Sequence, residues 1–485
     1  MRKAKARSVK AEKKRRRKTN QEIVLVTYFF TLLFVGIIGY LGYFIYFKSS
    51  DYANSEYNSK RQTLSQTQYI RGDILSADGK TLATTKTADS TETRYYPFGS
   101  VFAHVVGYST RGITGLESVA NSYLLSSHSN LILQAADSLQ DKKILGDTVV
   151  TTLDSKLQQV AYDAMGDYKG AVVVMNPKTG AVLAMVSKPD YDPNQIADIW
   201  DQLTSDTSNS NLVNRATQGL YPPGSTFKII TSLEYIRENP STYSKFTYDC
   251  DSVYTVGDYS IKCSHSTSHG EQDFTQAFAN SCNGAFAKIG QTLNFAKVYN
   301  LCSEFGYNQT LPISLLSKAS SFTVKDSSSL WDVLQSSIGQ GTTTVTPLQN
   351  LLVAATVANN GVMMKPYLID HVEDTDGNTV ETFSPETNAT IMTSSEAAIL
   401  KKMMRAVVTE GTGTKAQGEG YTVAGKTGSA EWATGKDPHA WFVGFANVED
   451  PEIAVCVIVE QGNSGGSTAA PIAKKIFDAY FAEKK

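Results

Sequence analysis

The stretch Tyr221-Pro-Pro-Gly-Ser-Thr-Phe-Lys228, "YPPGSTFK", decides how this chain is interpreted. Two prolines fix φ and the glycine permits a sharp reversal, so the stretch predicts a stiff turn that delivers Ser225 to the start of a helix. The apolar spacing of that helix comes from Phe227, Ile230 and Leu233. Residues three apart share a helix face, so we expect Ser225 and Lys228 to lie within hydrogen-bonding reach. Taken alone, the pair also fits an N-cap serine followed by a solvated lysine.

Acyl transfer by a helix-mounted serine and lysine needs a second proton-relay group, an oxyanion hole and a cation for the substrate. A Ser-x-Asn motif occurs once, at Ser281-Cys-Asn283, after a segment with helical apolar spacing. Lys-Thr-Gly occurs twice, at Lys178 and at Lys426. The first copy lies in the turn of a predicted hairpin, so we interpret Lys178 as structural. The second copy predicts a strand whose flanking glycines permit the close approach of a ligand backbone.

Strand signals lie at both ends of the long C-terminal part of the chain. Residues 170–186 form two β-rich runs around an Asn-Pro-Lys-Thr-Gly turn, which predicts a hairpin. Residues 440–446 and 453–460 are strand-like, and residues 468–481 predict an amphipathic helix. The chain between them is mostly helical in pattern. This order predicts an α/β (α+β) fold with one mainly antiparallel sheet flanked by helices.

A basic arm followed by an apolar run marks the N-terminus. The first 20 residues contain eleven Lys or Arg and one acidic residue, Glu12, and residues 23–47 contain no charge. Because about 20 apolar residues span a bilayer, residues 23–47 predict a transmembrane helix. The positive-inside rule then predicts residues 1–22 in the cytoplasm and residues 48–485 outside the cell membrane. We interpret the basic arm as a determinant of topology and lipid attraction, and we predict no nucleic-acid partner.

Composition and length indicate the class of protein and its division into domains. With 41% apolar and 19% charged residues, the 485-residue chain is typical of globular proteins with large cores. We divide it into a basic arm (1–22), a transmembrane helix (23–47), a small mixed domain (48–150) and a large C-terminal domain (151–485). Within the small domain, Asp78-Gly79 indicates a hairpin.

The five cysteines leave two interpretations open. Cys250 and Cys263 lie in a polar stretch and fit a disulfide hairpin in an oxidising compartment. The same two cysteines with His265 and His269 loosely resemble a zinc spacing, but the two-residue cysteine spacing of zinc sites is missing, so we predict no metal and no cofactor. Cys282, Cys302 and Cys456 lie in apolar surroundings and are expected to be buried thiols.

Ser-x-x-Lys, Ser-x-Asn and Lys-Thr-Gly in this order resemble the active-site motifs of penicillin-binding proteins and serine β-lactamases. More of the chain resembles the class B penicillin-binding proteins. The resemblance implies that residues 48–150 are a short pedestal, similar to a dimerisation domain, and that residues 151–485 are the transpeptidase domain. The further matching blocks are Arg71-Gly-Asp73, Gly115-Leu-Glu117, Gln218–Lys228, His269-Gly270, Gly339-Gln-Gly341, Thr346–Gln349 and Ala440–Gly444. The resemblance covers nearly everything after residue 22. It implies a penicilloyl-serine-transferase domain, similar to β-lactamases, that cross-links peptidoglycan as a D,D-transpeptidase.

The resemblance also implies a role for each motif residue. Ser225 would attack the carbonyl of a stem peptide ending in D-Ala-D-Ala, and Lys228 would be the neutral base, its pKa lowered by burial and by a charged Lys426. Ser281 would relay a proton and Asn283 would bond to Lys228 and the substrate. The substrate's carboxylate and backbone would lie against Lys426, Thr427, Gly428 and Ser429. The backbone N–H groups of Ser225 and Ser429 would form the oxyanion hole.

Several functions and partners follow as expectations. β-Lactam antibiotics should acylate Ser225, and a membrane-embedded glycan polymerase, a SEDS-type glycosyltransferase, is expected to act in trans because the pedestal is too short for a glycosyltransferase domain. A membrane-anchored serine β-lactamase is one alternative, but no Glu-x-x-Leu-Asn-like element that could activate water is evident. A catalytically silent scaffold or β-lactam sensor is the other. Ser429 stands where the family commonly has threonine, which bears on β-lactam affinity.

Overall fold

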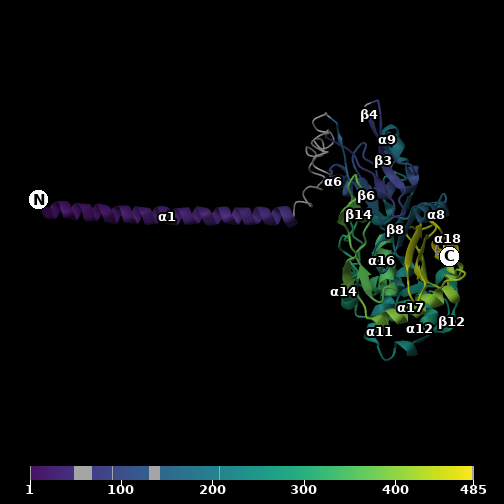
Figure 1. Ribbon diagram of the computed structural model, residues 1–485. Helices are drawn as coiled ribbons and strands as arrows, with labels where there is room; N and C mark the ends of the chain where they lie inside the picture. The colour runs from purple at the N-terminus through teal and green to yellow at the C-terminus, as the bar shows by residue number, and fades with distance from the viewer. Residues whose placement is uncertain (1, 48–67, 90, 130–141, 207, 483–485) are drawn as a thin grey trace. The chain divides into compact units, whose positions relative to one another are not determined.

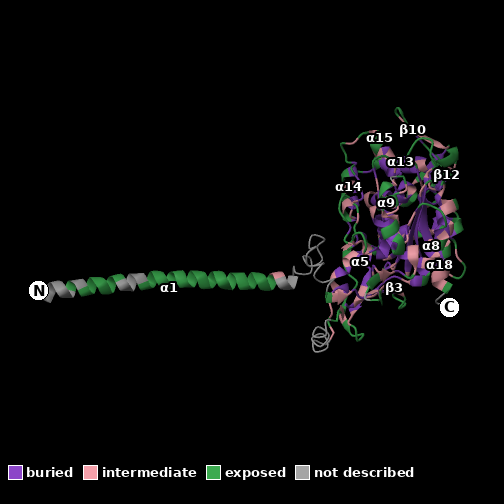
Figure 2. Ribbon diagram, turned by 90° about the horizontal axis from the view of Figure 1, so that it is seen from above, coloured by how far each residue is buried: buried purple, intermediate pink, exposed green. Residues whose placement is uncertain are grey.

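The computed structural model describes residues 2–47, 68–89, 91–129, 142–206 and 208–482, in two compact units. In the first unit, α1 (Arg2–Phe47) is a continuous helix whose described residues are almost all exposed (Figures 1 and 2). It is the one helix of the described chain that is long and apolar enough to cross a membrane, by length and composition. Residues 48–67 and 130–141 of the predicted pedestal lie outside the described residues.

A five-stranded antiparallel sheet forms the centre of the second unit, which spans residues 65–485. Its order is β17-β18-β19-β7-β8, so the last three strands of the chain join the early hairpin in one sheet through the β19–β7 pair, as predicted. The bounds are β7 (Gly170–Met175), β8 (Val182–Lys188), β17 (Val423–Ala430), β18 (His439–Ala446) and β19 (Ile453–Val459). Every residue of β7, β18 and β19 is buried, because helices cover both faces.

Two helices cover one face of this sheet. They are α8 (Ser155–Met165), capped by Asp154, and α18 (Ala470–Ala482), which begins two residues later than predicted because a π-helical turn at Gly465–Ala469 precedes it. Both pack side by side against the sheet (Figure 1).

The opposite face packs against a larger helical layer. Its central member, α16 (Pro347–Ala358), is buried along its whole length. The other helices are α10 (Arg215–Gln218), α11 (Lys228–Glu238), α12 (Phe274–Ala279), α13 (Asn283–Thr292), α14 (Phe295–Glu304), α15 (Leu330–Ser337) and α17 (Ser394–Thr409). The predicted fold class, a sheet flanked by helices, is confirmed.

A second sheet joins the pedestal to the catalytic part. Its order is β15-β14-β6-β2-β3-β4. The bounds are β2 (Ile74–Leu75), β3 (Thr81–Ala88), β4 (Thr91–Tyr95), β6 (Thr148–Thr151), β14 (Ile369–Glu373) and β15 (Thr379–Thr382). The expected boundary at residue 150 therefore falls inside β6, and β14 and β15 reach the pedestal sheet from far along the chain. Gly79 has φ +74° in the predicted β2–β3 turn.

Shorter elements complete the unit. The pedestal contains α4 (Ala103–Val106), α5 (Gly115–Val119), α6 (Asn121–Leu124), and the pair β1 (Tyr69–Ile70) and β5 (Ile144–Leu145). Elsewhere lie α9 (Ile196–Ser205) and the pair β13 (Val362–Met364) and β16 (Thr387–Thr390). Two antiparallel pairs lie beside α12 and α13. One is β9 (Thr247–Cys250) with β12 (Gly270–Asp273), and the other is the hairpin of β10 (Val253–Val256) and β11 (Tyr259–Lys262).

Candidate active site

Ser225 lies in a tight 3-10 turn, Gly224–Phe227, that leads directly into α11. Gly224 has φ +54°, and a Cβ at this position would come within 3.1 Å of the Ser429 carbonyl oxygen on β17. A glycine is therefore needed here, both for the backbone conformation and for the close approach of the turn to β17. This explains the Pro-Pro-Gly sequence: it presents Ser225 beside the edge of the sheet.

Lys228 is fully buried and contacts the Ser-x-Asn motif. Its Nζ donates to the Ser281 carbonyl oxygen at 2.7 Å and to Asn283 Oδ1 at 2.8 Å, and lies 3.3 Å from Ser281 Oγ. In the described chain no hydrogen bond joins it to Ser225, so the expected direct contact is absent from this state. Catalytic hydrogen bonds often tighten only when substrate is bound. Burial lowers the pKa of Lys228 to about 8.

Lys426 reaches the same serine from β17. Its Nζ donates to Ser281 Oγ at 2.9 Å and to the Thr427 carbonyl oxygen at 3.2 Å. Burial, together with the positive charge of Lys228, lowers the pKa of Lys426 well below its ordinary value. We expected a charged Lys426 to depress Lys228. Instead both lysines are fully buried, so both amines are pushed toward the neutral form, and burial is the main cause in each.

Ser281 has a backbone conformation that few non-glycine residues adopt. Its φ is +57°, between the end of α12 and the start of α13. Cys282 is the N-cap of α13, since its Sγ accepts from the Ala285 N–H at 3.4 Å. Ser281 and Asn283 are therefore not caps, and their side chains are free to face the two lysines. Asn283 also donates to the Lys262 carbonyl oxygen at 2.9 Å.

The Lys-Thr-Gly strand β17 is an edge of the central sheet, and its residues Thr427, Gly428 and Ser429 line a cleft. Thr427 is held by a hydrogen bond between its Oγ1 and that of Thr412, 2.6 Å apart. The flanking glycines also make room for the protein itself, because a Cβ on Gly425 would collide with the Phe442 ring and one on Gly428 would press on Pro223 and Thr226. That they admit a ligand backbone stays a prediction.

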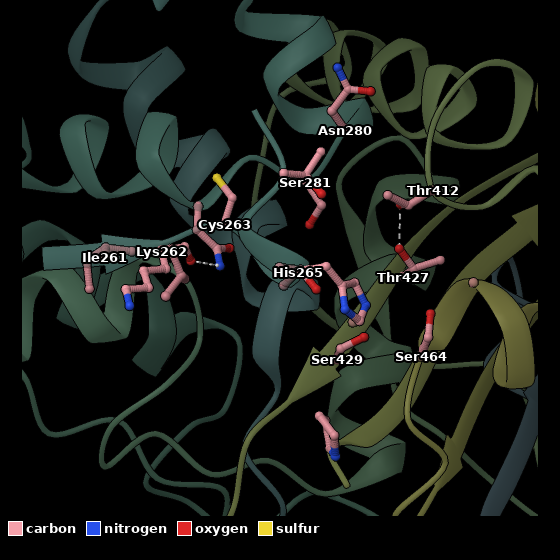
Figure 3. Close-up of a pocket in the computed structure, with 18 of the residues that line it drawn as sticks. Ile261, Lys262, Cys263, His265, Asn280, Ser281, Thr412, Thr427, Ser429 and Ser464 are labelled. Atoms are coloured by element: carbon pink, nitrogen blue, oxygen red, sulfur yellow. Dashed lines mark hydrogen bonds between the residues drawn. The ribbon is translucent and has the colours of Figure 1, made fainter. Parts of the chain in front are cut away.

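These groups line one cleft of about 870 Å³ (Figure 3). Of the predicted site residues, Ser225, Ser281, Asn283, Thr427, Gly428 and Ser429 line it. The two lysines lie beneath its wall. Sequence analysis missed Thr412, which follows α17, and the segment 264–267, whose His265 lies between Ser281 and Ser429 in Figure 3. Thr412 belongs to no motif and His265 was noted only for a loose zinc spacing, so no local signal marked either as a cleft residue.

Several residues that stand out in the sequence are not part of the group formed by Ser225, the two lysines, Ser281 and Asn283. Lys178 is an exposed residue of the β7–β8 turn and forms an ion pair with Asp450 at 2.5 Å, as a structural residue would. Trp441 is a core residue whose Nε1 donates to the Pro222 carbonyl oxygen at 3.0 Å. His439 is buried and stacks on Trp432. All five cysteines are free thiols in the structure, and Cys250 and Cys263 form no disulfide.

A serine at the start of a helix, two buried lysines and an edge strand together define a serine acyltransferase. Comparison with known families agrees. Residues 170–478 match the penicillin binding protein transpeptidase domain, and residues 71–149 match the penicillin binding protein A dimerisation domain. The chain belongs to the penicillin-binding protein transpeptidase family, in its class B, as the motifs predicted.

Individual relatives cover most of the chain. The peptidoglycan D,D-transpeptidase PbpA of Mycolicibacterium smegmatis is 35% identical, over 90% of this chain and 94% of the relative. The namesake from Mycobacterium tuberculosis is 32% identical over 89% of this chain and 93% of its own length. The structure of penicillin-binding protein A from M. tuberculosis as a penicillin G acyl-enzyme complex is 30% identical with a TM-score of 0.78, and it covers 85% of this chain and 100% of that one.

Proposed function

We propose that this chain cross-links peptidoglycan as a D,D-transpeptidase through an acyl-enzyme on Ser225. The observation that supports these roles most directly is the set of hydrogen bonds by which Lys228 and Lys426 both hold Ser281, which lines the same cleft as Ser225. A serine hydroxyl needs a base to become a nucleophile, and a proton must return to the leaving amine. The two lysines and Ser281 form a proton path that can do both.

Each step uses groups described above. Ser225 Oγ attacks the carbonyl carbon of the D-Ala-D-Ala bond and gives its proton to neutral Lys228. The C–N bond then breaks: Ser281 passes its proton to the departing D-Ala amine and regains one from protonated Lys228, while the acyl group stays on Ser225 as an ester. An amine of a neighbouring stem peptide attacks this ester, which forms the cross-link, and the proton that this amine loses returns to Ser225 through Lys228. A β-lactam enters the same first step and leaves Ser225 acylated.

Binding of the donor peptide is assigned to β17. Thr427 and Ser429, which line the cleft, hold its terminal carboxylate and backbone along this edge of the sheet, and the buried Lys426 supports them through its hydrogen bond to the Thr427 carbonyl oxygen. The N–H groups of Ser225 and Ser429 stabilise the oxyanion, which is worth about 3 kcal/mol per donor in other acyl-transfer enzymes. The approach of Gly224 to the Ser429 carbonyl oxygen supports this pairing, because it keeps the two backbone segments adjacent.

Membrane topology and the polymerase partner are part of the same proposal. The basic residues before the apolar part of α1 place residues 1–22 in the cytoplasm and the catalytic unit on the other side. The two matched segments, 71–149 and 170–478, are a dimerisation domain and a transpeptidase domain, so glycan polymerisation is assigned to a membrane-embedded SEDS-type glycosyltransferase in trans. Failure of any such polymerase to co-purify with the full chain would count against this part.

Acylation by benzylpenicillin tests the function. We expect residues 65–485, one compact unit, to gain the mass of one drug molecule and to keep it for longer than the assay, with the adduct on the tryptic peptide that contains Ser225. Heat-unfolded protein is the control, because acylation requires the assembled site. Rapid loss of the adduct with drug hydrolysis would instead establish a β-lactamase, and complete absence of an adduct would favour the silent scaffold.

The pH dependence of acylation follows from Lys228. Only its neutral form can accept the proton from Ser225, and its pKa is about 8, so the ammonium form dominates below that pH. We expect the second-order rate constant for benzylpenicillin to rise about tenfold per pH unit up to pH 8 and to level off above it. Melting temperatures at each pH control for unfolding. A flat profile from pH 6 to pH 9 would remove Lys228 as the base.

A further inference from the structure

Four sulfur and nitrogen ligands converge directly behind the Ser-x-Asn motif. Cys250 ends β9, Cys263 follows β11, His269 precedes β12, and Cys282 lies between Ser281 and Asn283. Their ligand atoms all lie within 4.8 Å of one another. The three cysteines are buried and the histidine is half-buried, and Cys263 and His269 also line the cleft, so the cluster adjoins the active site. We call these four residues the Cys₃His cluster.

The spacing of the ligand atoms fits a metal ion better than a disulfide. The Sγ atoms of Cys250 and Cys263 are 3.7 Å apart, as are those of Cys263 and Cys282. A disulfide requires about 2.05 Å and can join only two of the three thiols. In a tetrahedral zinc site with Zn–S bonds of about 2.3 Å, two sulfurs lie about 3.8 Å apart. His269 Nδ1 is 3.3 Å from Cys250 Sγ, close to the about 3.6 Å of such a site.

We propose that the Cys₃His cluster binds one divalent metal ion of the zinc class. Three thiolates and one imidazole form a closed four-ligand shell, which is typical of a structural zinc site without an open position for chemistry. Each thiol releases its proton to solvent as its metal–sulfur bond forms. The Cys282 sulfur also accepts the Ala285 N–H, a hydrogen bond that orients this ligand from outside the shell. This proposal differs from the prediction of no metal made from sequence, where Cys282 was not connected to the other three residues.

The ion would hold the active site together from behind; this part rests on the function proposed above. Cys282 fixes the backbone between Ser281 and Asn283, and Ser281 has the sparsely populated φ of +57°, which surrounding structure must maintain. Cys263 and His269 bound the segment 264–268, whose residues His265 and Ser266 also have positive φ and line the cleft. The pairs β9–β12 and β10–β11 have two strands each, and isolated pairs of this size are marginal in stability. One ion therefore fixes the positions of the segment 264–268 and of Ser281 relative to α13. We call this the clamping role.

Metal content is measured first, on the full chain purified in detergent under reducing conditions. We expect about one zinc per chain. After chelation, titration with Co²⁺ alone should give sulfur-to-cobalt charge-transfer absorption and tetrahedral d–d bands. Bound metal should also protect three cysteines from alkylation in the folded wild-type protein, a readout that does not depend on a variant folding. Absence of metal together with a featureless Co²⁺ titration would overturn the proposal, and so would a Cys250–Cys263 disulfide in the untreated protein.

Variants then assign the site. Cys250→Ala should lose the metal, whereas Cys302→Ala, which removes an equally buried thiol outside the cluster, should keep it. Retention of the metal by Cys250→Ala would overturn the assignment.

Acylation tests the clamping role separately. Chelated wild-type protein should react with benzylpenicillin at least about tenfold more slowly, and added Zn²⁺ should restore the rate. If the cluster binds metal but chelation leaves the acylation rate unchanged, the ion does not stabilise the active site and this part of the proposal is rejected. A zinc-loaded protein that never forms an adduct would instead count against the role of Ser225 and leave the metal site standing.

Discussion

Ser225→Ala is expected to abolish the benzylpenicillin adduct on residues 65–485 while leaving the folded protein intact. The variant lacks the only atom that can carry the acyl group in the mechanism above, so the adduct should fall from one per chain to below detection. In the described chain the Ser225 hydroxyl forms no hydrogen bond, so its removal leaves no buried group unpaired and the melting temperature should not change. Intact mass and thermal unfolding measure the two outcomes.

Ser264→Ala is the matched control, because Ser264 lines the same cleft but has no role in the mechanism. It should be acylated like the wild type. If Ser225→Ala is still acylated at full stoichiometry, the nucleophile is another residue, and peptide mapping would identify it. Such a result would contradict the assignment of Ser225 as the nucleophile. It would not affect family membership, which rests on the matches over residues 71–149 and 170–478.

Local patterns in the sequence were sufficient for the sheet and the motif positions. The hairpin of residues 170–186 is set by short β-rich runs and an Asn-Pro-Lys-Thr-Gly turn, both of which are local signals. Ser225 lies at a helix start because Pro-Pro-Gly forms a stiff turn immediately before it. The pairing of β19 with β7 joins distant segments into one sheet, and it was predictable only because strands lie at both ends of a helical region.

Features that depend on three-dimensional proximity were not predictable. Nothing in the sequence near Cys282 connects it to Cys250 or Cys263, because the turn between α12 and α13 brings it there. Likewise, β14 and β15 lie more than 200 residues after β6 in the chain, so the boundary at residue 150 was drawn through a strand that pairs across it. The preference of Lys228 for Ser281 over Ser225 arises from side-chain geometry that helix periodicity does not determine.

Glu117→Gln is expected to destabilise the pedestal by about 3–5 kcal/mol. The Glu117 carboxylate is fully buried between two guanidinium groups, with Arg94 Nε at 2.7 Å and Arg71 Nε also bonded to it. The side chains of Arg71 and Arg94 are 10% and 5% exposed, so glutamine would leave both charges buried without a counter-ion. Because β14 and β15 complete the pedestal sheet, the loss should appear in the unfolding of the whole unit 65–485, measured in urea.

Glu92→Gln is the matched control, since Glu92 is partly exposed and pairs with Lys143 in the same domain. Such pairs contribute about 0–1 kcal/mol, so this variant should unfold close to the wild type. Burial alone would raise the pKa of Glu117, but Arg71 and Arg94 outweigh it and hold that pKa below its ordinary value of 4.5. The contribution is therefore present at neutral pH and is lost as the pH falls through the folded-state pKa, so the difference between wild type and Glu117→Gln should narrow in acid. A difference that stayed constant down to pH 3, or equal effects of the two variants at pH 7, would show that Glu117 does not act as a buried counter-ion.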